Sequence, residues 1–244
     1  MFKADWPAPS HVKTAISTRQ GGVSLPPYAA LNLGSHVDDQ PEAVMQNRQL
    51  FRQQAKMPAE PLWLNQVHGT HCLVLEQADF SNGPVSADAS CTRTKGQVSV
   101  VLTADCLPVL FCDASGTQVA AAHAGWRGLV DGVLEQTLQQ FPQPAHVMAW
   151  LGPAIGPSAF EVGAEVRQAF VQKDAKAQAA FVAVQAKPGK WLADLYQLAT
   201  MRLNACGVTQ IYGGGFCTYT DAKRFYSYRR DGQTGRMASC IWID

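Results

Sequence analysis

The chain has 244 residues, a formal net charge of +1 and seven cysteines. This length suits one large domain with its own hydrophobic core. The near-neutral charge is not typical of proteins that bind nucleic acids or anionic membranes through a basic surface. An odd number of irregularly spaced cysteines does not indicate a disulfide framework and fits a reducing compartment. We therefore expect a protein that acts on a small molecule, and no protein partner is predicted.

The chain carries no obvious sign of targeting or of a division into domains. Residues Met1–Pro7 lack the apolar core of a signal peptide, and no stretch approaches the roughly 18 apolar residues of a membrane span. No internal repeat or low-complexity linker is visible. We predict a single soluble, cytoplasmic domain over residues 1–244.

Hydrophobic spacing predicts a helix over Pro41–Lys56, where Pro41 and Glu42 suit a helix start. Short apolar runs with β-branched residues then predict strands, at Cys72–Leu75, Val98–Thr103, Val109–Cys112, Gln118–His123 and Val147–Leu151. The segments between the three central strands, Ala104–Pro108 and Asp113–Thr117, suit turns. We therefore expect these three strands to pair as antiparallel hairpins.

Helical elements follow in the second half of the chain. After a break at Ala124–Gly128, the apolar spacing predicts helices at Leu129–Phe141, Ala164–Phe170 and Leu192–Cys206. A strand at Gln210–Tyr212 then leads into a glycine turn at Gly213–Gly215. Hairpins combined with scattered helices predict an α+β fold and not a doubly wound parallel sheet.

Three short segments each place a metal-capable side chain among turn residues at a strand end, where functional sites are commonly built. They are Asn65–Gly69 with His68, Thr103–Pro108 with Cys106, and Ala122–Gly128 with His123. Two imidazoles and a thiolate are good zinc ligands, and three protein ligands leave a fourth position for water or substrate. Their wide spacing differs from the close ligand pairs of structural zinc knuckles and favours a catalytic site.

Each of these ligands also has an ordinary structural explanation. A single histidine is commonly a hydrogen-bonded structural residue, and a single cysteine a small buried apolar one. His71 is a rival ligand, but it leads directly into an apolar run, and we assign it to the start of a strand.

The three segments resemble the signature blocks of the YfiH-like laccase-domain family. The resemblance covers nearly the whole chain and includes Thr18–Ser24, Leu31–Gly34, Asn47–Arg48, Gly152–Pro157, Phe160–Gly163, Phe225–Asp231 and Thr234–Arg236. It implies that His68, Cys106 and His123 hold one catalytic metal, zinc with copper as an alternative. It also implies a layered α+β fold, a mixed or antiparallel β core flanked by helices, similar to toxin-type (CNF-like) cysteine hydrolases.

The resemblance supplies several functions, since the family is variously labelled purine nucleoside phosphorylase, polyphenol oxidase and peptidoglycan editing factor. The first hypothesis is a zinc-dependent phosphorylase of adenosine, inosine and methylthioadenosine, with adenosine deamination as a second activity. The second is copper-dependent polyphenol oxidation, although six histidines and no His-x-His pair argue against a true multicopper oxidase. A hydrolase or editing role in peptidoglycan precursor synthesis and a non-catalytic zinc protein are the others.

Two further residues are candidates for catalysis. Asp105 precedes the metal cysteine and could orient a ligand or move a proton, or simply cap a turn. A guanidinium suits a phosphate oxyanion, and among Arg19, Arg48, Arg127, Arg229 and Arg230 we favour Arg48 because it lies in the Asn47–Arg48 block. Trp126 and Phe160 could stack on a purine, but core packing is favoured for both. For Cys217 a structural thiol is favoured.

Overall fold

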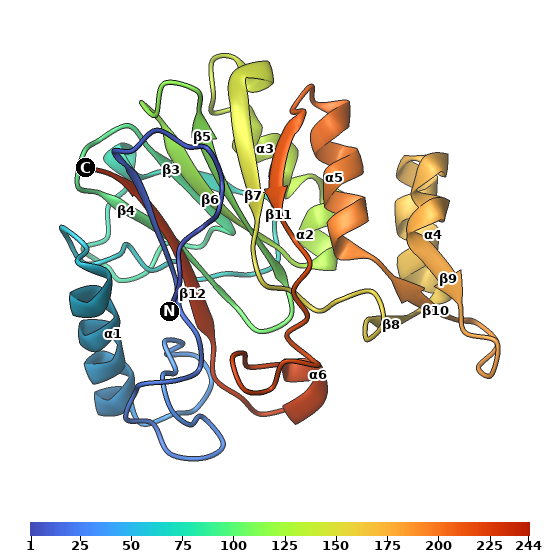
Figure 1. Ribbon diagram of the computed structural model, residues 1–244, viewed down its shortest axis with the longest axis horizontal. Helices are drawn as coiled ribbons and strands as arrows, with labels where there is room; N and C mark the ends of the chain where they lie inside the picture. Colours follow the sequence, from blue (N-terminus) through green and yellow to red (C-terminus); the bar gives the residue numbers. More distant parts are fainter.

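The computed structural model describes residues 1–244, and the chain folds into stacked layers of sheet and helix (Figure 1). A six-stranded sheet has the order β11-β7-β5-β6-β3-β2. Its strands are β11 (Gln210–Gly213), β7 (Val147–Leu151), β5 (Leu107–Asp113), β6 (Val119–Ala124), β3 (Ala89–Thr92) and β2 (Cys72–Val74). The outer pairs β11–β7 and β3–β2 are parallel and the central pairs are antiparallel, so the sheet is mixed. The predicted α+β class is confirmed.

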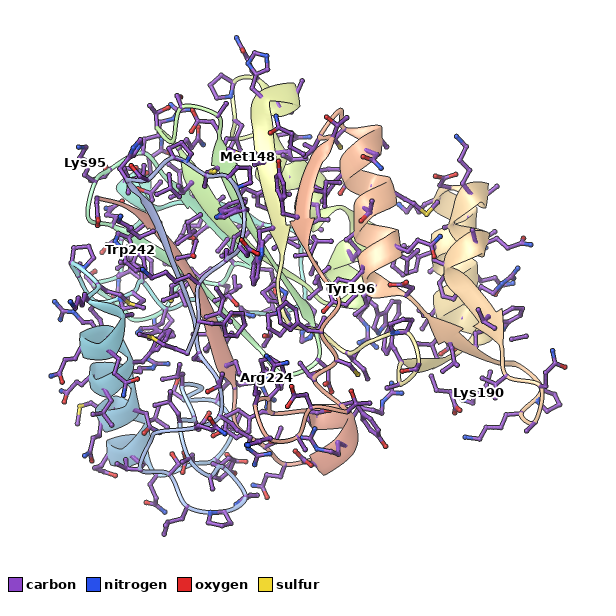
Figure 2. All side chains as sticks on the ribbon, viewed as in Figure 1. Lys95, Met148, Lys190, Tyr196, Arg224 and Trp242 are labelled. Atoms are coloured by element: carbon purple, nitrogen blue, oxygen red, sulfur yellow. The ribbon has the colours of Figure 1, made fainter.

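A second sheet of three strands packs against one face of the first. It consists of β1 (Val12–Ile16), β12 (Met237–Ile243) and β4 (Val98–Thr103), all antiparallel. Because successive strand residues point to opposite faces, Leu110 of β5 and Trp150 of β7 enter the layer between the two sheets together with Ile241 of β12. Figure 2 shows how densely side chains fill this space, where Met148 is labelled.

Helices cover the two outer faces. The other residues of β5 and β7, such as Val109 and Ala149, pack against α2 (Trp126–Asp131), α3 (Val133–Leu138) and α5 (Leu195–Ala205) in the largest apolar cluster. On the opposite side, α1 (Pro41–Ala55) places Phe51 against the outer face of the three-stranded sheet. The result is a helix, sheet, sheet, helix succession, and none of the helices is both long and apolar enough to cross a membrane.

A smaller unit stands beside these layers. It joins α4 (Ala164–Lys173) to a three-stranded sheet of β8 (Glu161–Gly163), β10 (Lys190–Ala193) and β9 (Phe181–Ala183). Figure 1 shows this unit projecting from the side of the main layers, and Figure 2 labels Lys190 on it. The remaining helix, α6 (Tyr228–Asp231), is a single turn before β12.

One expectation about local pairing needs correction. The strands at Val98 and Val109 do not form a hairpin, because β4 pairs with β12 in the three-stranded sheet while β5 pairs with β6 and β7 in the other. The chain between them therefore crosses from one sheet to the next. The expected hairpin of β5 with β6 is present.

The helix expected at Leu129–Phe141 begins earlier and is divided. It starts at Trp126, and Gly132 separates α2 from α3 with a φ of 110°, a left-handed conformation that favours glycine. The last long helix starts at Leu195, since Leu192 and Ala193 belong to β10 and Asp194 caps the helix. Strands β1, β3, β8, β9, β10 and β12 were not expected from the sequence.

Candidate metal centre

Three strand-end segments bring His68, Cys106 and His123 together. His68 lies in the loop before β2, Cys106 immediately before β5, and His123 in β6 opposite Pro108 of β5. One ligand atom from each lies within 4.8 Å of the others, and the Cys106 Sγ is 3.8 Å from the His68 Nε2. This is the chain's one cluster of three or more metal-capable side chains within such reach. A thiolate and two imidazoles at this spacing fit a zinc or copper ion.

The backbone around the cluster adopts conformations that few residues tolerate. Asp105 and His68 have φ values of 94° and 60°, in the left-handed region. Gly125 leaves the space that the ligands occupy, because a Cβ there would lie 2.8 Å from the His68 Cδ2 and 3.0 Å from the Cys106 Sγ. Strain and close approach at one place are typical of functional sites.

A buried carboxylate, Asp88, supports two of the ligands at once. Its Oδ1 is 2.8 Å from the His123 Nδ1 and accepts a hydrogen bond of 2.9 Å from the backbone N–H of His68. Its Oδ2 accepts from the backbone N–H of Gly69 at 2.7 Å and of Val67 at 3.1 Å. Because the His123 Nδ1 is engaged, its Nε2 is left for a metal, and the carboxylate fixes the orientation of the ring.

Without a metal, the neighbouring side chains favour a negatively charged Cys106 thiolate beside a positively charged His123 ring. Burial opposes ionisation of the Cys106 thiol, but the imidazoles of His123 and His68 outweigh it and lower the pKa of Cys106 to about 6. Burial also opposes protonation of His123, but the Cys106 thiolate and Asp88 raise the pKa of His123 to about 9. Burial acts against the Asp88 charge as well, yet its hydrogen bonds to His123 and Gly69 lower the pKa of Asp88 overall.

The ligands lie at a cleft of about 360 Å³ that opens to solvent. His123 is 3% exposed, Cys106 is half-buried and His68 is exposed, so the ligand set runs from the interior to the surface. Gln66 fastens the His68 loop to β4, since its amide donates to the Leu102 carbonyl at 2.8 Å and accepts from the Leu102 N–H at 2.7 Å. Other residues lining the cleft are His36, Thr103, Ala104, Tyr228 and Arg236.

Comparison with known proteins places this fold and cluster in a family. Residues 13–244 match a family model described as multi-copper polyphenol oxidoreductase laccase. The chain belongs to this family. It is 56% identical to the purine nucleoside phosphorylase YfiH of Escherichia coli (strain K12), over 98% of this chain and 96% of the relative. It is 54% identical to the purine nucleoside phosphorylase PA4543 of Pseudomonas aeruginosa, over the same shares of 98% and 96%.

Solved structures of this laccase-domain family share the fold. A crystal structure of the Neisseria meningitidis protein NMB0706 superposes with a TM-score of 0.94 and 52% identity, covering 100% of this chain and 98% of that one. The YfiH protein of Bacillus licheniformis gives a TM-score of 0.88 at 28% identity, covering 96% and 93%. The resemblance to YfiH-like proteins expected from the sequence is confirmed.

The other two predicted site residues lie apart from the metal ligands' donor atoms. The Asp105 carboxylate accepts from the Thr218 hydroxyl at 2.6 Å and from the backbone N–H of Arg229 at 2.7 Å, and its own carbonyl accepts from Ile155 N–H at 2.9 Å. Asp105 thus joins the Cys106 turn to α6 and to the Gly152–Pro157 loop.

Arg48 lines a separate cavity on the α1 side of the molecule. Its Nε donates to the Leu33 carbonyl at 3.0 Å, and its guanidinium lies 4.0 Å from the centre of the Trp63 ring. Burial lowers the pKa of Arg48 to about 10, against the opposing charge of Glu60. The arginine that does line the metal cleft is Arg236.

The remaining candidates have mainly structural contacts. Arg230 donates to three backbone carbonyls and pairs with Asp231, while Phe160 is buried in the main core. His71 is not part of the metal cluster, and its ring lies 3.3 Å from the Ser86 carbonyl. The packing interpretation of Phe160 and the structural assignment of His71 are therefore confirmed.

Sequence reasoning missed Asp88 and gave Arg236 no role. One available signal for Asp88 was its place in the run of small residues Ala87–Cys91, since a carboxylate there can be buried only with strong hydrogen-bond partners. The sequence gave no comparable signal for Arg236, because it does not show which arginines lack an acidic partner.

Proposed function

We propose that this chain is a zinc-dependent purine nucleoside phosphorylase that acts on adenosine, inosine and methylthioadenosine. The observation that carries the proposal is the cluster of His68, Cys106 and His123 at an open cleft, in a chain 54–56% identical to relatives named purine nucleoside phosphorylase. The cleft volume of about 360 Å³ lies in the range of small-molecule sites.

The reaction defines what the site must do. A phosphate oxygen forms a bond to C1′ of the ribose while the bond from C1′ to the purine nitrogen breaks. The electron pair of that bond leaves with the purine, which takes up a proton. The products are the free base and a sugar 1-phosphate, which is ribose 1-phosphate for adenosine and inosine and methylthioribose 1-phosphate for methylthioadenosine. The site therefore has to bind a phosphate anion beside the ribose and to stabilise the negative charge that moves onto the base.

The chain's residues would hold the metal in a fixed place. His68, Cys106 and His123 are the ligands that we propose, and Asp88 orients His123 and the loop of His68 through hydrogen bonds of 2.7–3.1 Å. When bound, zinc would supply a positive centre that polarises or places an oxygen ligand. Such preorganised support reduces the rearrangement needed during the reaction.

For Asp105 and Arg48 the contacts favour positioning roles over contact with the reacting atoms. Both Asp105 carboxylate oxygens accept hydrogen bonds from the protein, which supports a role in holding the Cys106 turn against α6. Arg48 lines a neighbouring cavity. Burial and then the charge of Arg236 lower the pKa of His36 in the metal cleft, and the charge of Arg48 adds to this effect. We propose that Arg48 contributes to phosphate use as a positioning residue, through the Leu33 carbonyl to which its Nε donates.

Copper-dependent polyphenol oxidation is a second candidate, favoured by the description of the family. The ligand set accepts copper as well as zinc. A multicopper oxidase, however, needs several copper sites, and this chain brings together one cluster of three ligands. We therefore place oxidation below phosphorolysis.

A third candidate uses the same residues without a metal. Cys106, His123 and Asp88 stand in the order nucleophile, base and orienting carboxylate that cysteine hydrolases use. The hydrogen-bonded pair of His123 and Asp88, at 2.8 Å, is the observation that favours it. This arrangement fits the proposed likeness in fold to toxin-type hydrolases and an editing role in peptidoglycan precursor synthesis.

One experiment tests the proposed function. Metal-quantified protein is incubated with adenosine, inosine and methylthioadenosine, with and without phosphate, and the products are resolved chromatographically. Phosphorolysis gives the free base and the sugar 1-phosphate (methylthioribose 1-phosphate in the case of methylthioadenosine) only when phosphate is present, and a second, deaminase activity gives inosine from adenosine without phosphate. Failure to release any base from the three nucleosides with zinc-loaded protein would reject the proposed function.

A further inference from the structure

The metal cleft continues into a second cavity of similar size. This neighbour also has a volume of about 360 Å³, and the two share His36, Tyr228 and Arg236 in their linings. Arg236 therefore lies at the junction of two spaces, one of which contains the three metal ligands. Two adjacent compartments of this kind can hold the two substrates of one reaction.

Arg236 forms no ion pair in the protein. None of the six ion pairs of the chain involves Arg236, although Asp38 lines the second cavity. Burial is the main cause of a lowered pKa of Arg236, and the negative charges of Cys106 and Asp105 oppose it only in part, so the guanidinium is partly removed from water. A desolvated cation is costly unless an anion or strong acceptors compensate it.

One edge of the guanidinium makes no hydrogen bond within the protein. Nη1 donates to the carbonyls of Thr234 at 2.8 Å and Gly235 at 3.2 Å, which uses both of its hydrogens. Nε and Nη2 have no hydrogen-bond partner in the protein, and neither atom is fully buried. Because Arg236 lines both cavities, a ligand there can reach this edge. Two parallel N–H groups on one edge form the fork that binds two oxygens of an oxyanion.

The segment beside Arg236 is shaped to hold this side chain. The Arg236 backbone N–H donates to the fully buried Asn32 Oδ1 at 2.9 Å, and its carbonyl accepts from the Leu33 N–H at 3.2 Å. Gly34 leaves room for the stem, because a Cβ at that position would be 2.7 Å from the Arg236 Cγ. A side chain held from two sides keeps its fork in place, which lowers the entropy cost of binding.

A nearby hydroxyl adds a second unpartnered group. The Oγ1 of Thr234, a residue 2% exposed that lines the second cavity, has no hydrogen-bond partner. By contrast, Arg230 has all three guanidinium nitrogens engaged by carbonyls and Asp231. Arg236 is therefore available for a ligand in a way that Arg230 is not.

We propose that Arg236 binds the phosphate co-substrate through its Nε–Nη2 edge, at the junction of the metal cleft and the second cavity. This inference rests on the proposed phosphorylase function, because a free phosphate is the oxyanion that this reaction requires. A carboxylate of a substrate would present similar oxygens to the same fork, so the two sources have to be distinguished experimentally.

The test measures binding directly, by equilibrium dialysis of radiolabelled inorganic phosphate against the full chain at constant ionic strength. The variants are Arg236→Met, which keeps an apolar stem but removes the charge, and Arg236→Lys. The control is Arg52→Met, since Arg52 is also half-buried, forms no ion pair and donates only to the Pro58 carbonyl. Each protein is measured zinc-loaded and after chelation, and circular dichroism melting confirms folding.

We expect Arg236→Met to bind phosphate at least about tenfold more weakly in both metal states, since two charge-assisted hydrogen bonds are lost. Arg236→Lys should recover part of this loss, and Arg52→Met should match the parent. Phosphate binding by a folded Arg236→Met or Arg236→Lys protein that equals the parent's would overturn the proposal. So would stronger competition by lactate than by unlabelled phosphate, which would assign the fork to a carboxylate.

The result for Arg236 can be distinguished from the result for the proposed phosphorylase function. If phosphate binding depends on Arg236 while the parent cleaves no nucleoside, the anion site stands and the phosphorylase assignment fails. If the parent shows phosphate-dependent cleavage and Arg236→Met keeps the parent's phosphate KM, the phosphorylase stands and the role of Arg236 is rejected.

Discussion

The two ends of strand β5 carry cysteines with opposite chemistry. Cys112, near the end of the strand, is fully buried in the layer between the sheets, and burial raises its pKa to about 12. Cys106, just before the strand, faces two imidazoles that lower its pKa to about 6 against the effect of burial. The same residue type is thus a small apolar filler at one end and a thiolate at the other, because only one end has cationic neighbours.

Two carboxylates, Asp113 and Asp88, also have different roles at the two ends of the sheet. Asp113 closes the turn after β5, accepting from the backbone N–H of Gln118 at 2.8 Å and the Thr117 hydroxyl at 2.8 Å. Asp88 instead binds the backbone and ring of metal-ligand residues. One end of the sheet uses a carboxylate to shape a turn, and the other uses one to orient a site.

The largest effect should come from exchanging the thiolate itself. We expect Cys106→Ser to lower zinc affinity by more than about 100-fold, beyond the range typical of residues that only support a ligand. Cys112→Ala should keep the metal and lose only stability, about 1 kcal/mol or somewhat more, through a small cavity. Competition with a chelator gives the affinities, and thermal unfolding gives the stability. Equal zinc affinity of the two variants would refute the assignment of Cys106 as a ligand.

The pH dependence of thiol alkylation tests the two cysteines in the unmodified chain. In protein stripped of metal, the iodoacetamide reaction of Cys106 should rise with pH, reach half its maximum near its pKa of about 6, and level off above it. Cys112, with a pKa of about 12, stays a thiol at neutral pH and should react on the order of 100-fold more slowly. Peptide mass spectrometry assigns the modified sites. A Cys106 midpoint near 8.5, the usual value for a free thiol, would contradict the proposed charge pair.

Substitution of the carboxylates should have a smaller effect on the metal. Asp88→Asn keeps the size of the side chain but weakens its hold on His123 and on the His68 loop, so zinc affinity should fall by about 10–100-fold. Asp113→Asn is the matched control, and its zinc affinity should equal that of the parent. Isothermal titration of zinc into the metal-free proteins measures both. A parallel loss in the two variants would mean that Asp88 acts only through general stability.

The cluster could be predicted because each of its three side chains lies close to one end of an apolar run. His68, Cys106 and His123 are all of this kind, and their signature blocks added the expectation that the fold joins them. The hairpin of β4 with β5 was predicted wrongly because close spacing in sequence does not distinguish a hairpin from a crossing between sheets. The strand that pairs with β4 in place of β5 is β12, which lies at the far end of the chain.

The residues that support the site were harder to predict than the three residues of the cluster. Asp88 precedes Ala89–Thr92, a strand of small residues with weak strand propensity, so neither the strand nor its neighbour was identified. The choice among arginines was difficult for a different reason. Whether a guanidinium is engaged by carbonyls, as in Arg230, or has a free edge, as in Arg236, depends on tertiary contacts that local patterns do not contain.

The smallest effect is expected for Arg48, which is connected to Arg236 through one residue. The Leu33 carbonyl accepts from the Arg48 Nε at 3.0 Å, and the Leu33 N–H donates to the Arg236 carbonyl at 3.2 Å. Loss of one such hydrogen bond is worth about 1 kcal/mol, so Arg48→Ala should raise the phosphate KM about fivefold, less than Arg236→Met, and leave the nucleoside KM unchanged. Steady-state kinetics with each substrate varied in turn measures this split.

The origin of the Arg48 effect can be resolved by Arg48→Lys and by salt. If Arg48 acts by its charge across the cleft, lysine restores the phosphate KM, and added salt reduces the difference between parent and Arg48→Ala. If Arg48 acts by holding Leu33 and hence Arg236, lysine does not restore the phosphate KM and added salt has little influence. Lysine lacks the planar group that lies over Trp63 while donating to the Leu33 carbonyl. We expect the second result, since Arg48 lines a different cavity from the metal ligands. A phosphate KM for Arg48→Ala higher than that of Arg236→Met would reverse the ranking and make Arg48 the anion site.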